Sequence, residues 1–210
     1  MDNRTLHSYC DRHTTLPVEV LHDLERETHL RTLSPQMMSG KVQGHLLYLL
    51  CSLQQPALAL EIGTFTGYGA VCLAAGLPSH GCLHSIEINP ELAEFPRHYL
   101  GQAGLADKVR LHIGDARTVI PTLPKPFDLV FIDAAKFDYL LYYEMVMDRV
   151  RSGGLILADN AIWGGKVLDP ACQDADTRRM ADFNRRVHED PRVENLLLPV
   201  RDGLLVARKK

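Results

Sequence analysis

The sequence lacks any segment that could span a bilayer and any framework of paired cysteines. No apolar run approaches the about 20 residues that a transmembrane helix needs, and the stretch MDNRTLHSYCDRH has no apolar core of a signal peptide. The five cysteines are odd in number and form no CxxC pair, which argues against a disulfide framework or a zinc site. We therefore expect a cytoplasmic protein without membrane contact.

Strong charge of one sign is also missing. The formal net charge is −3 over 210 residues, so no global basic field points to nucleic acid. The length fits one domain, and an apolar fraction of 46% is ordinary for a globular protein. We expect a single domain over 1–210, with helices in about residues 1–54 as an N-terminal appendage.

Short apolar runs alternate with helical patterns along most of the chain. We predict strands at 57–62, 82–88, 108–114, 127–133 and 155–159, and helices at 16–33, 41–53, 67–76, 90–101, 138–150 and 174–190. The segment 152–154 marks the end of the helix at 138–150. Asp202-Gly203 between two apolar runs predicts a closing hairpin. The fold class is α/β: a Rossmann-like, doubly wound, mostly parallel seven-stranded sheet with a C-terminal antiparallel hairpin.

Such a sheet binds ligands at the carboxyl ends of its strands. The first strand is followed by the run from Glu61 to Gly69, whose glycines allow a sharp turn and close approach of the backbone to a ligand. The following helix N-terminus favours an anionic group. The pattern is not GxGxxG, which argues against a dinucleotide. The alternative is a tight turn that binds nothing.

The second and third strands also end in carboxylates. Glu87, about 20 residues past the glycine turn, could accept from two ribose hydroxyls; the alternative is a solvated charge. Asp115 could accept from an adenine amino group, or could serve as a helix N-cap, or both.

The fourth and fifth strands end at Asp133 and at Asp159-Asn160. Two carboxylates and an amide oxygen are hard ligands, which suit Mg²⁺ or Ca²⁺ better than zinc. The alternative is that these side chains cap turns and helices. Lys136 lies one turn after Asp133. A nearby cation disfavours the ammonium form, and a neutral amine is a competent general base. Trp163 could form a wall for a flat aromatic substrate or belong to the core.

Six motifs in order, LEIGTFTGYG, HSIEINP, GDA, FIDAAK, LADNAIWGG and LPVRDGLLVARKK, resemble the metal-dependent class I O-methyltransferases over residues 34–210. That family includes catechol O-methyltransferase and the caffeoyl-CoA O-methyltransferases. The resemblance implies S-adenosylmethionine as cofactor, together with a divalent cation, Mg²⁺ before Ca²⁺ or Mn²⁺. It also implies a homodimer.

The resemblance further implies roles for particular residues. Glu61, Gly63 and Tyr68 would line the methionine part of the cofactor, Glu87 would hold the ribose, and Asp115 with Ala116 would face the adenine. The remaining cofactor candidates are Met37, Ser39, Thr66, Gly67, Gly69, Ile88 and Asp133. The implied metal ligands are Asp133, Asp159 and Asn160; the implied catalytic residues are Lys136 and Asp133; and Lys136 and Trp163 would face the substrate.

Some positions depart from the family pattern. Gly69 stands where a serine often binds the cofactor carboxylate, and Ala135 stands where many relatives have a second aspartate. The loop after Trp163 is short, which puts acyl-CoA specificity in doubt.

We therefore expect an S-adenosylmethionine-dependent O-methyltransferase that acts on a metal-chelated hydroxyl of a small, catechol-like (vicinal dihydroxy aromatic) acceptor. The alternative acceptor is a hydroxyuridine in tRNA, contacted by Arg178, Arg179, Arg185 and Arg186 from a polar helix. More distant alternatives are a nicotinamide oxidoreductase and a cofactor-binding module that has lost catalysis.

Overall fold

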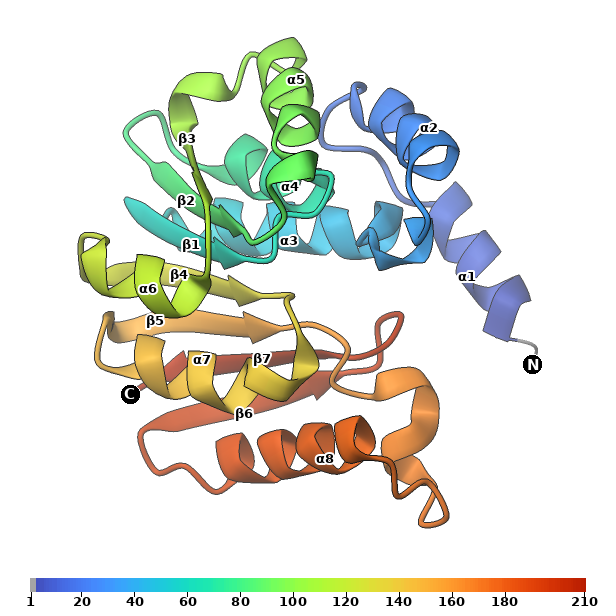
Figure 1. The fold of residues 1–210 in the computed structure, drawn as a ribbon, viewed down its shortest axis with the longest axis vertical. Coiled ribbons are helices and arrows are strands. Elements are labelled where there is room, and N and C mark those ends of the chain that lie inside the picture. The colour runs from blue at the N-terminus through green and yellow to red at the C-terminus, as the bar shows by residue number, and fades with distance from the viewer. Residues whose placement is uncertain (1–2) are drawn as a thin grey trace.

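The centre of the protein is a seven-stranded sheet with the strand order β3-β2-β1-β4-β5-β7-β6. A computed structural model describes residues 3–210. The strands are β1 (Leu58–Ile62), β2 (Cys82–Glu87), β3 (Val109–Ile113), β4 (Phe127–Ile132), β5 (Val150–Ala158), β6 (Val193–Leu198) and β7 (Leu204–Lys209). Strands β1 to β5 are parallel, and their carboxyl ends meet at one edge of the sheet (Figure 1).

The central strands are buried on both faces, as their continuous apolar runs predict. In β4 the residues from Leu129 to Ile132 are at most 1% exposed. The C-terminal hairpin adds two antiparallel strands, and β7 pairs with both β5 and β6. The predicted α/β sheet with its closing hairpin is thus confirmed.

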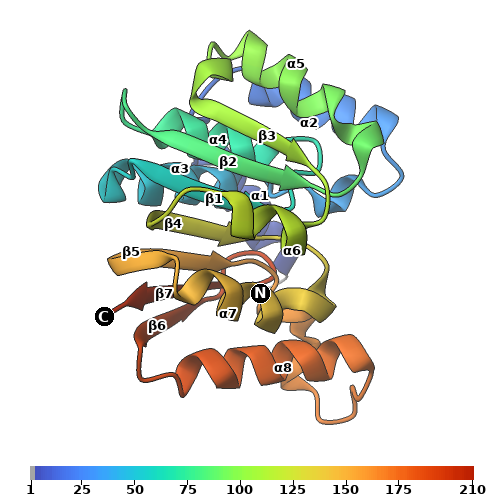
Figure 2. The ribbon, with the colours of Figure 1, turned by 60° about the vertical axis from the view of Figure 1, so that its left-hand side comes forward.

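Helices cover both faces of the sheet (Figures 1 and 2). One face carries α2 (Leu21–Arg31), α3 (Gly40–Gln54), α4 (Tyr68–Gly76) and α5 (Glu94–Gln102). The other carries α6 (Ala116–Val119), α7 (Tyr139–Met147) and α8 (Ala175–His188). Helix α1 (Asn3–Arg12) extends away from this body in Figure 1. Within residues 3–210, no helix has the length and apolar character needed to cross a membrane.

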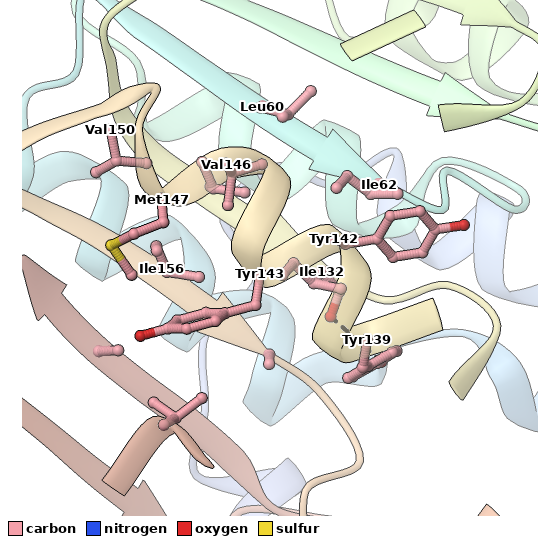
Figure 3. Packing of buried hydrophobic residues seen from close by; sticks show 14 of the residues in the cluster. Leu60, Ile62, Ile132, Tyr139, Tyr142, Tyr143, Val146, Met147, Val150 and Ile156 are labelled. Atoms are coloured by element: carbon pink, nitrogen blue, oxygen red, sulfur yellow. Dashed lines mark hydrogen bonds between the residues drawn. The ribbon is translucent and has the colours of Figure 1, made fainter. Parts of the chain in front are cut away.

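The core below β4 and β5 is rich in tyrosine. Tyr139, Tyr142 and Tyr143 of α7 are at most 5% exposed and pack with Ile132 and Ile156 of the sheet (Figure 3). This packing fixes the start of α7, and therefore the segment that joins α7 to the end of β4.

Three predicted boundaries are wrong. The helix predicted at 16–33 begins only at Leu21, because residues 17–20 form a bend and a turn closed by the bond from the N–H of Leu21 to the carbonyl of Val18; a separate helix, α1, precedes it. The helix predicted at 90–101 is divided into a 3₁₀ turn, Pro90–Leu92, and α5. Pro96 has no N–H to donate, so it is tolerated only in the first turn of a helix, and α5 accordingly starts at Glu94.

The third correction concerns the segment 152–154, which does not mark the end of a helix, because α7 already ends at Met147. It lies inside β5, which begins at Val150. The register between β4 and β5 shifts near Phe127, and Gly153 has φ +77, a conformation that suits glycine. A bulge of this kind lets the strand continue past a glycine pair.

Candidate active site

The loop after β1 depends on glycines for different reasons. Gly63 has φ +100, and a Cβ there would overlap the backbone carbonyl of Asp133. Gly67 has φ +95, and a Cβ there would lie 2.8 Å from the Cβ of Pro96. Gly69 has an ordinary backbone, but a Cβ would lie 2.5 Å from Oε1 of Glu61. The side chain missing at Gly69 therefore leaves room for the Glu61 carboxylate.

Glu61 is a buried carboxylate at the end of β1. Ser85 donates a short hydrogen bond to its Oε2, and Thr64 lies 2.6 Å from the Ser85 hydroxyl. Since Ser85 uses its proton on Glu61, Thr64 is the donor to Ser85. Burial raises the pKa of Glu61 to about 8, although the bond from Ser85 opposes this shift. The carboxyl group is therefore poised to respond to a cationic neighbour.

A small cavity of about 10 Å³ lies beside Glu61. Seven of the predicted cofactor residues line it: Met37, Ser39, Glu61, Gly63, Tyr68, Gly69 and Asp133. Met38, Thr64, Phe65 and Phe131 complete the lining. The Tyr68 hydroxyl is buried and has no hydrogen-bond partner in the protein. A buried polar atom without a partner is suited to meet a ligand.

Six predicted cofactor residues do not line this cavity. Thr66 is buried, with its hydroxyl 3.0 Å from that of Thr28 on α2. Glu87 accepts from the backbone N–H of Phe65, at 2.7 Å, and of Asn89, at 2.8 Å. Glu87 therefore holds the glycine-rich loop in place. The others are Gly67, Ile88, which is exposed, Asp115 and Ala116, which is buried.

Asp115 is the N-cap of α6, the structural alternative considered for it. Its side chain accepts from the backbone N–H of Arg117 at 2.8 Å and pairs with the Arg117 guanidinium. These bonds from Arg117 lower the pKa of Asp115. The Arg117 side chain bonds both carboxylate oxygens, and the Asp115 side chain stays 28% exposed, so part of it faces solvent.

The ends of β4 and β5 bring Asp133 and Asp159 together. Ile132 is paired with Ala158, and the N–H of Asp159 donates to the carbonyl of Ile132 at 3.0 Å. Burial, and next the charge of Asp133, raise the pKa of Asp159 to about 6. Gln43 of α3 donates to Oδ2 of Asp159 at 2.7 Å. Two neighbouring carboxylates with so little solvent are an environment that a cation would stabilise.

Asn160 follows directly, with φ +57, a left-handed conformation uncommon outside glycine but tolerated by asparagine. Its amide nitrogen donates to Oδ2 of Asp202 at 3.3 Å. Because the nitrogen is turned to Asp202, the amide oxygen is left free for another partner.

This donor set fits a hard divalent cation. Among residues 3–210 there is no group of three or more His, Cys, Asp or Glu side chains that could hold a metal ion. The predicted set has two carboxylates and one amide oxygen, an all-oxygen composition typical of Mg²⁺ sites that keep water or substrate as further ligands.

Lys136 lies beside the first of these carboxylates. Its amine is 3.2 Å from Oδ1 of Asp133 and 2.8 Å from the hydroxyl of Tyr139. Tyr139 is buried, and burial together with Asp133, Asp159 and Asp202 raises its pKa well above the ordinary value. A neutral hydroxyl at this point can accept from the lysine.

Trp163 begins a 3₁₀ turn, Trp163–Leu168, in the loop after β5. It packs against the apolar cluster of α7 and α8, and its ring N–H is buried without a partner. Part of its surface therefore belongs to the core, as the alternative interpretation has it.

A second hollow is larger and lies elsewhere. An open groove of about 580 Å³ between α2 and α5 is lined by charged and polar side chains and by Phe95 and Tyr99. None of the predicted site residues lines it. The candidate site therefore lies at the strand ends, although the cavity beside Glu61 is smaller than the groove between α2 and α5.

Sequence reasoning missed four side chains that shape the site: Gln43, Ser85, Tyr139 and Asp202. Gln43 lies within a helix and Ser85 within a strand, where no local pattern distinguishes them. Asp202 was taken only as a turn signal. Tyr139, three residues after Lys136, had a usable signal in the helical spacing that places both on one face.

Comparison with known proteins gives one family. A family model described as O-methyltransferase matches residues 11–210. Caffeoyl-CoA O-methyltransferase 1 of Eucalyptus globulus is 33% identical over 186 residues, covering 82% of this chain and 75% of the relative.

Two solved structures are similar to the whole fold. The O-methyltransferase TomG of Streptomyces achromogenes, solved with SAM, has a TM-score of 0.89 at 32% identity, covering 98% of this chain and 96% of its own. A methyltransferase of Podospora anserina, solved with SAH, has a TM-score of 0.91 at 27% identity, covering 100% of this chain and 97% of its own.

Proposed function

The chain belongs to the O-methyltransferase family and is an S-adenosylmethionine-dependent enzyme of that class, and from this premise we propose that a divalent cation holds its acceptor, a small catechol-like phenol. One observation carries the proposal. Asp133 and Asp159 stand side by side at the ends of β4 and β5, next to the amide of Asn160 and the amine of Lys136. The Eucalyptus relative is a caffeoyl-CoA O-methyltransferase, which supports a phenolic acceptor.

Asp133, Asp159 and Asn160 would hold the cation, preferably Mg²⁺, with Ca²⁺ or Mn²⁺ as other options. The cation, when bound, would supply Lewis-acid stabilisation to the ionised hydroxyl of the acceptor. A free phenol has a pKa near 10, so that little of it is ionised at neutral pH without such help.

The residues around the cavity would bind and orient the methyl donor. Tyr68 offers a buried hydroxyl without a partner, and Met37 and Ser39 also line the cavity. Glu87 would hold the ribose, and Asp115 with Ala116 would face the adenine. Gly69 presents no side chain, so backbone N–H groups at the start of α4 would meet the donor's carboxylate.

Lys136 would act as the general base. Its amine would take the proton from the acceptor hydroxyl, and the oxygen would attack the sulfonium methyl in line. The C–O bond forms as the S–C bond breaks, and the charges of anion and cation disperse together. Fixing the two reactants in this geometry can contribute about 7–11 kcal/mol.

A hydroxyuridine of tRNA stays the alternative acceptor. Its expected contacts are the arginines of α8, and three of them are engaged within the protein. Arg179 pairs with Asp176, Arg185 with Asp182 and Glu189, and Arg186 with Glu144. Because these arginines already have acidic partners within the protein, the arginine-bearing face of α8 is better explained as a solvated helix face than as a tRNA contact. This supports the small acceptor.

Isotope transfer from labelled S-adenosylmethionine to a panel of catechols, with Mg²⁺ and then with EDTA, tests the proposal. We expect methylation that EDTA abolishes and Mg²⁺ restores. Transfer that is unaffected by EDTA would overturn the role of the cation. Failure with every catechol, while SAH still binds, would overturn the acceptor class and favour tRNA.

A further inference from the structure

The turn between β6 and β7 contacts both halves of the candidate site. On the cofactor side, Nη1 of Arg201 donates to the carbonyl of Met38 at 2.8 Å and to that of Ser39. Nη2 lies 3.5 Å from the carbonyl of Gln36. The guanidinium thus binds the backbone of the segment 36–39, which forms one wall of the cavity beside Glu61.

On the metal side, the next residue binds the loop after β5. Asp202 accepts from the amide of Asn160 at 3.3 Å through Oδ2, and from the N–H of Gly164 through Oδ1. Its backbone carbonyl accepts from Ile162 at 2.8 Å. Asp202 therefore fixes which end of the Asn160 amide faces Asp133 and Asp159.

The backbone that joins these contacts is stiff. Arg201 has φ +49, and Gly203 has φ +90 with its N–H bonded to Val200 at 2.8 Å. A Cβ at Gly203 would lie 2.5 Å from the side chain of Ile162, so the turn is pressed against the loop. Left-handed non-glycine residues persist only where the surroundings hold them. Arg201 and Asp202 are therefore expected to move together.

A second connection runs through α3. The wall segment leads directly into this helix, whose Gln43 donates to Asp159 at 2.7 Å with both side chains at most 2% exposed. Both proposed metal ligands on β5 and its loop are thus tied to the cofactor wall, Asp159 through Gln43 and Asn160 through Asp202.

We propose that Arg201 and Asp202 are positioning residues that couple cofactor binding to divalent-cation binding; this rests on the cation site proposed above. The cavity of about 10 Å³ is far below the roughly 300–1,000 Å³ of small-molecule sites, so that the wall must shift to admit the cofactor. Once the cofactor orders residues 36–39, Arg201 is fixed, and Asp202 and Asn160 with it. The cation then finds its amide ligand already oriented, and binds more tightly.

Coupling of this kind is reciprocal: each ligand must strengthen the other by the same factor. We expect a factor of about 5–150, the usual range for coupled sites. In the test, calorimetric titrations with SAH are made without and with saturating Mg²⁺, and titrations with Mg²⁺ are made without and with saturating SAH. The proteins are the full chain and the variants Arg201→Ala, Arg201→Lys and Asp202→Asn.

In Arg201→Ala, SAH should bind more weakly and the coupling factor should fall toward the smaller part that the Gln43–Asp159 connection carries, while Mg²⁺ affinity without SAH stays close to that of the parent. Arg201→Lys keeps a charge and one donor and should restore part of the coupling. Asp202→Asn cannot accept from Asn160 in the same way, so Mg²⁺ affinity should fall about 10–100-fold, as for other residues that orient metal ligands.

Arg208→Ala is the matched control. Arg208 lies on β7 of the same hairpin and pairs with Glu194 at the surface, away from both sites. It should leave both affinities and their coupling unchanged. An unchanged coupling factor in Arg201→Ala, or an unchanged Mg²⁺ affinity in Asp202→Asn, would overturn the inference and leave the proposed function standing. Absence of Mg²⁺ binding to the parent protein would overturn both.

Discussion

The amine of Lys136 lies 2.8 Å from the hydroxyl of Tyr139, three residues further along the chain. The same hydroxyl lies 3.3 Å from the carbonyl of Ile132, to which it can donate its own proton. The lysine also stands over the tyrosine ring, with Nζ 4.8 Å from the ring centre. Since Tyr139 is held in the core, the lysine at the site mouth has little freedom to leave Asp133.

Replacement of this lysine should remove the base and little else. In Lys136→Ala we expect turnover to fall about 10²–10⁴-fold, the usual contribution of general acid–base catalysis. SAH affinity should stay near that of the parent. Steady-state kinetics and calorimetry measure the two quantities. The exposed Lys125 gives a control, Lys125→Ala, that should change neither. If Lys136→Ala turned over as fast as the parent, Lys136 would not be the general base.

Loss of Asp159, the buried aspartate directly after β5, should separate catalysis from cofactor binding. Asp159→Ala removes one of two proposed carboxylate ligands but no residue that lines the cavity. We expect methyl transfer to fall by more than about 100-fold, since loss of even an outer ligand partner costs that much. SAH affinity measured without a cation should be nearly unchanged. Parent-like turnover would refute the metal site.

Substitution of the glycine in the hairpin turn should destabilise the fold. Gly203→Ala places a methyl group 2.5–2.9 Å from Ile162 atoms at a φ of +90. We expect a loss of more than about 1 kcal/mol in the free energy of unfolding, because alanine is strained at such a φ. Gly101→Ala is the control: it has no heavy atom within 4 Å of the new methyl group and lies in helix α5. It should stabilise by about 0.5–1 kcal/mol.

The gain or loss in these two variants can be measured by urea denaturation. Equal effects of the two substitutions would show that the close approach of Gly203 to Ile162 has no energetic weight.

A salt bridge behind α7 should make stability depend on acid pH. Asp190 accepts from the Arg192 guanidinium at 2.6 Å and from the Tyr143 hydroxyl at 3.0 Å. The bond from Arg192 chiefly lowers the pKa of Asp190 far below its ordinary value of about 3.9. The folded state thus releases this proton more readily than the unfolded state. The stabilisation is full above about pH 4 and is lost as the pH falls further.

Asp190→Asn should therefore unfold more easily than the parent at pH 7, by about 1–3 kcal/mol for a buried charge-assisted bond. The difference should shrink as the pH falls below about 4. Denaturation curves between pH 7 and pH 3 provide the measurement. A difference that is constant over this range would show that the ionised carboxylate contributes nothing.

A pair of histidines on β2 and β3 should make the free energy of unfolding depend on pH a second time, in a less acidic range. His84 and His112 are 2.9 Å apart, ring nitrogen to ring nitrogen, and burial lowers the pKa of both, His84 also through His112. The folded state resists protonation, so the pair's stabilisation is present above about pH 6.5 and declines as the pH falls through 6 to 5. His112→Gln should flatten this decline in urea titrations; an unchanged slope would exclude the pair as its source.

The sequence predicted the sheet well because its signals are local. Apolar runs such as 127–133 admit few alternatives once they are bounded by turns, and Asp202-Gly203 predicted the hairpin. The failures came where two signals compete. Pro90 and Pro96 both suit a helix start, and the structure has a 3₁₀ turn at the first and α5 around the second. Gly153 and Gly154 predict the end of a helix, whereas the sheet accommodates them as a bulge.

The site was only half predictable, for a different reason. Residues that follow a strand can be placed by topology, which is how Asp133 and Asp159 were expected to be neighbours. Their supporting partners come from far along the chain: 116 residues separate Gln43 from Asp159, and 42 separate Asn160 from Asp202. No local pattern in one sequence encodes such pairs. The homodimer, the cytoplasmic location and the domain limits stay predictions.

The place of β7 between β5 and β6 has a consequence for synthesis on the ribosome. The loop that carries Asn160, and the segment 36–39, obtain their contacts with Arg201 and Asp202 only after those two residues have emerged. A nascent chain can form the first five parallel strands much earlier, but without this turn. We therefore expect the nascent protein to acquire ligand binding abruptly, at the moment when β7 inserts into the sheet.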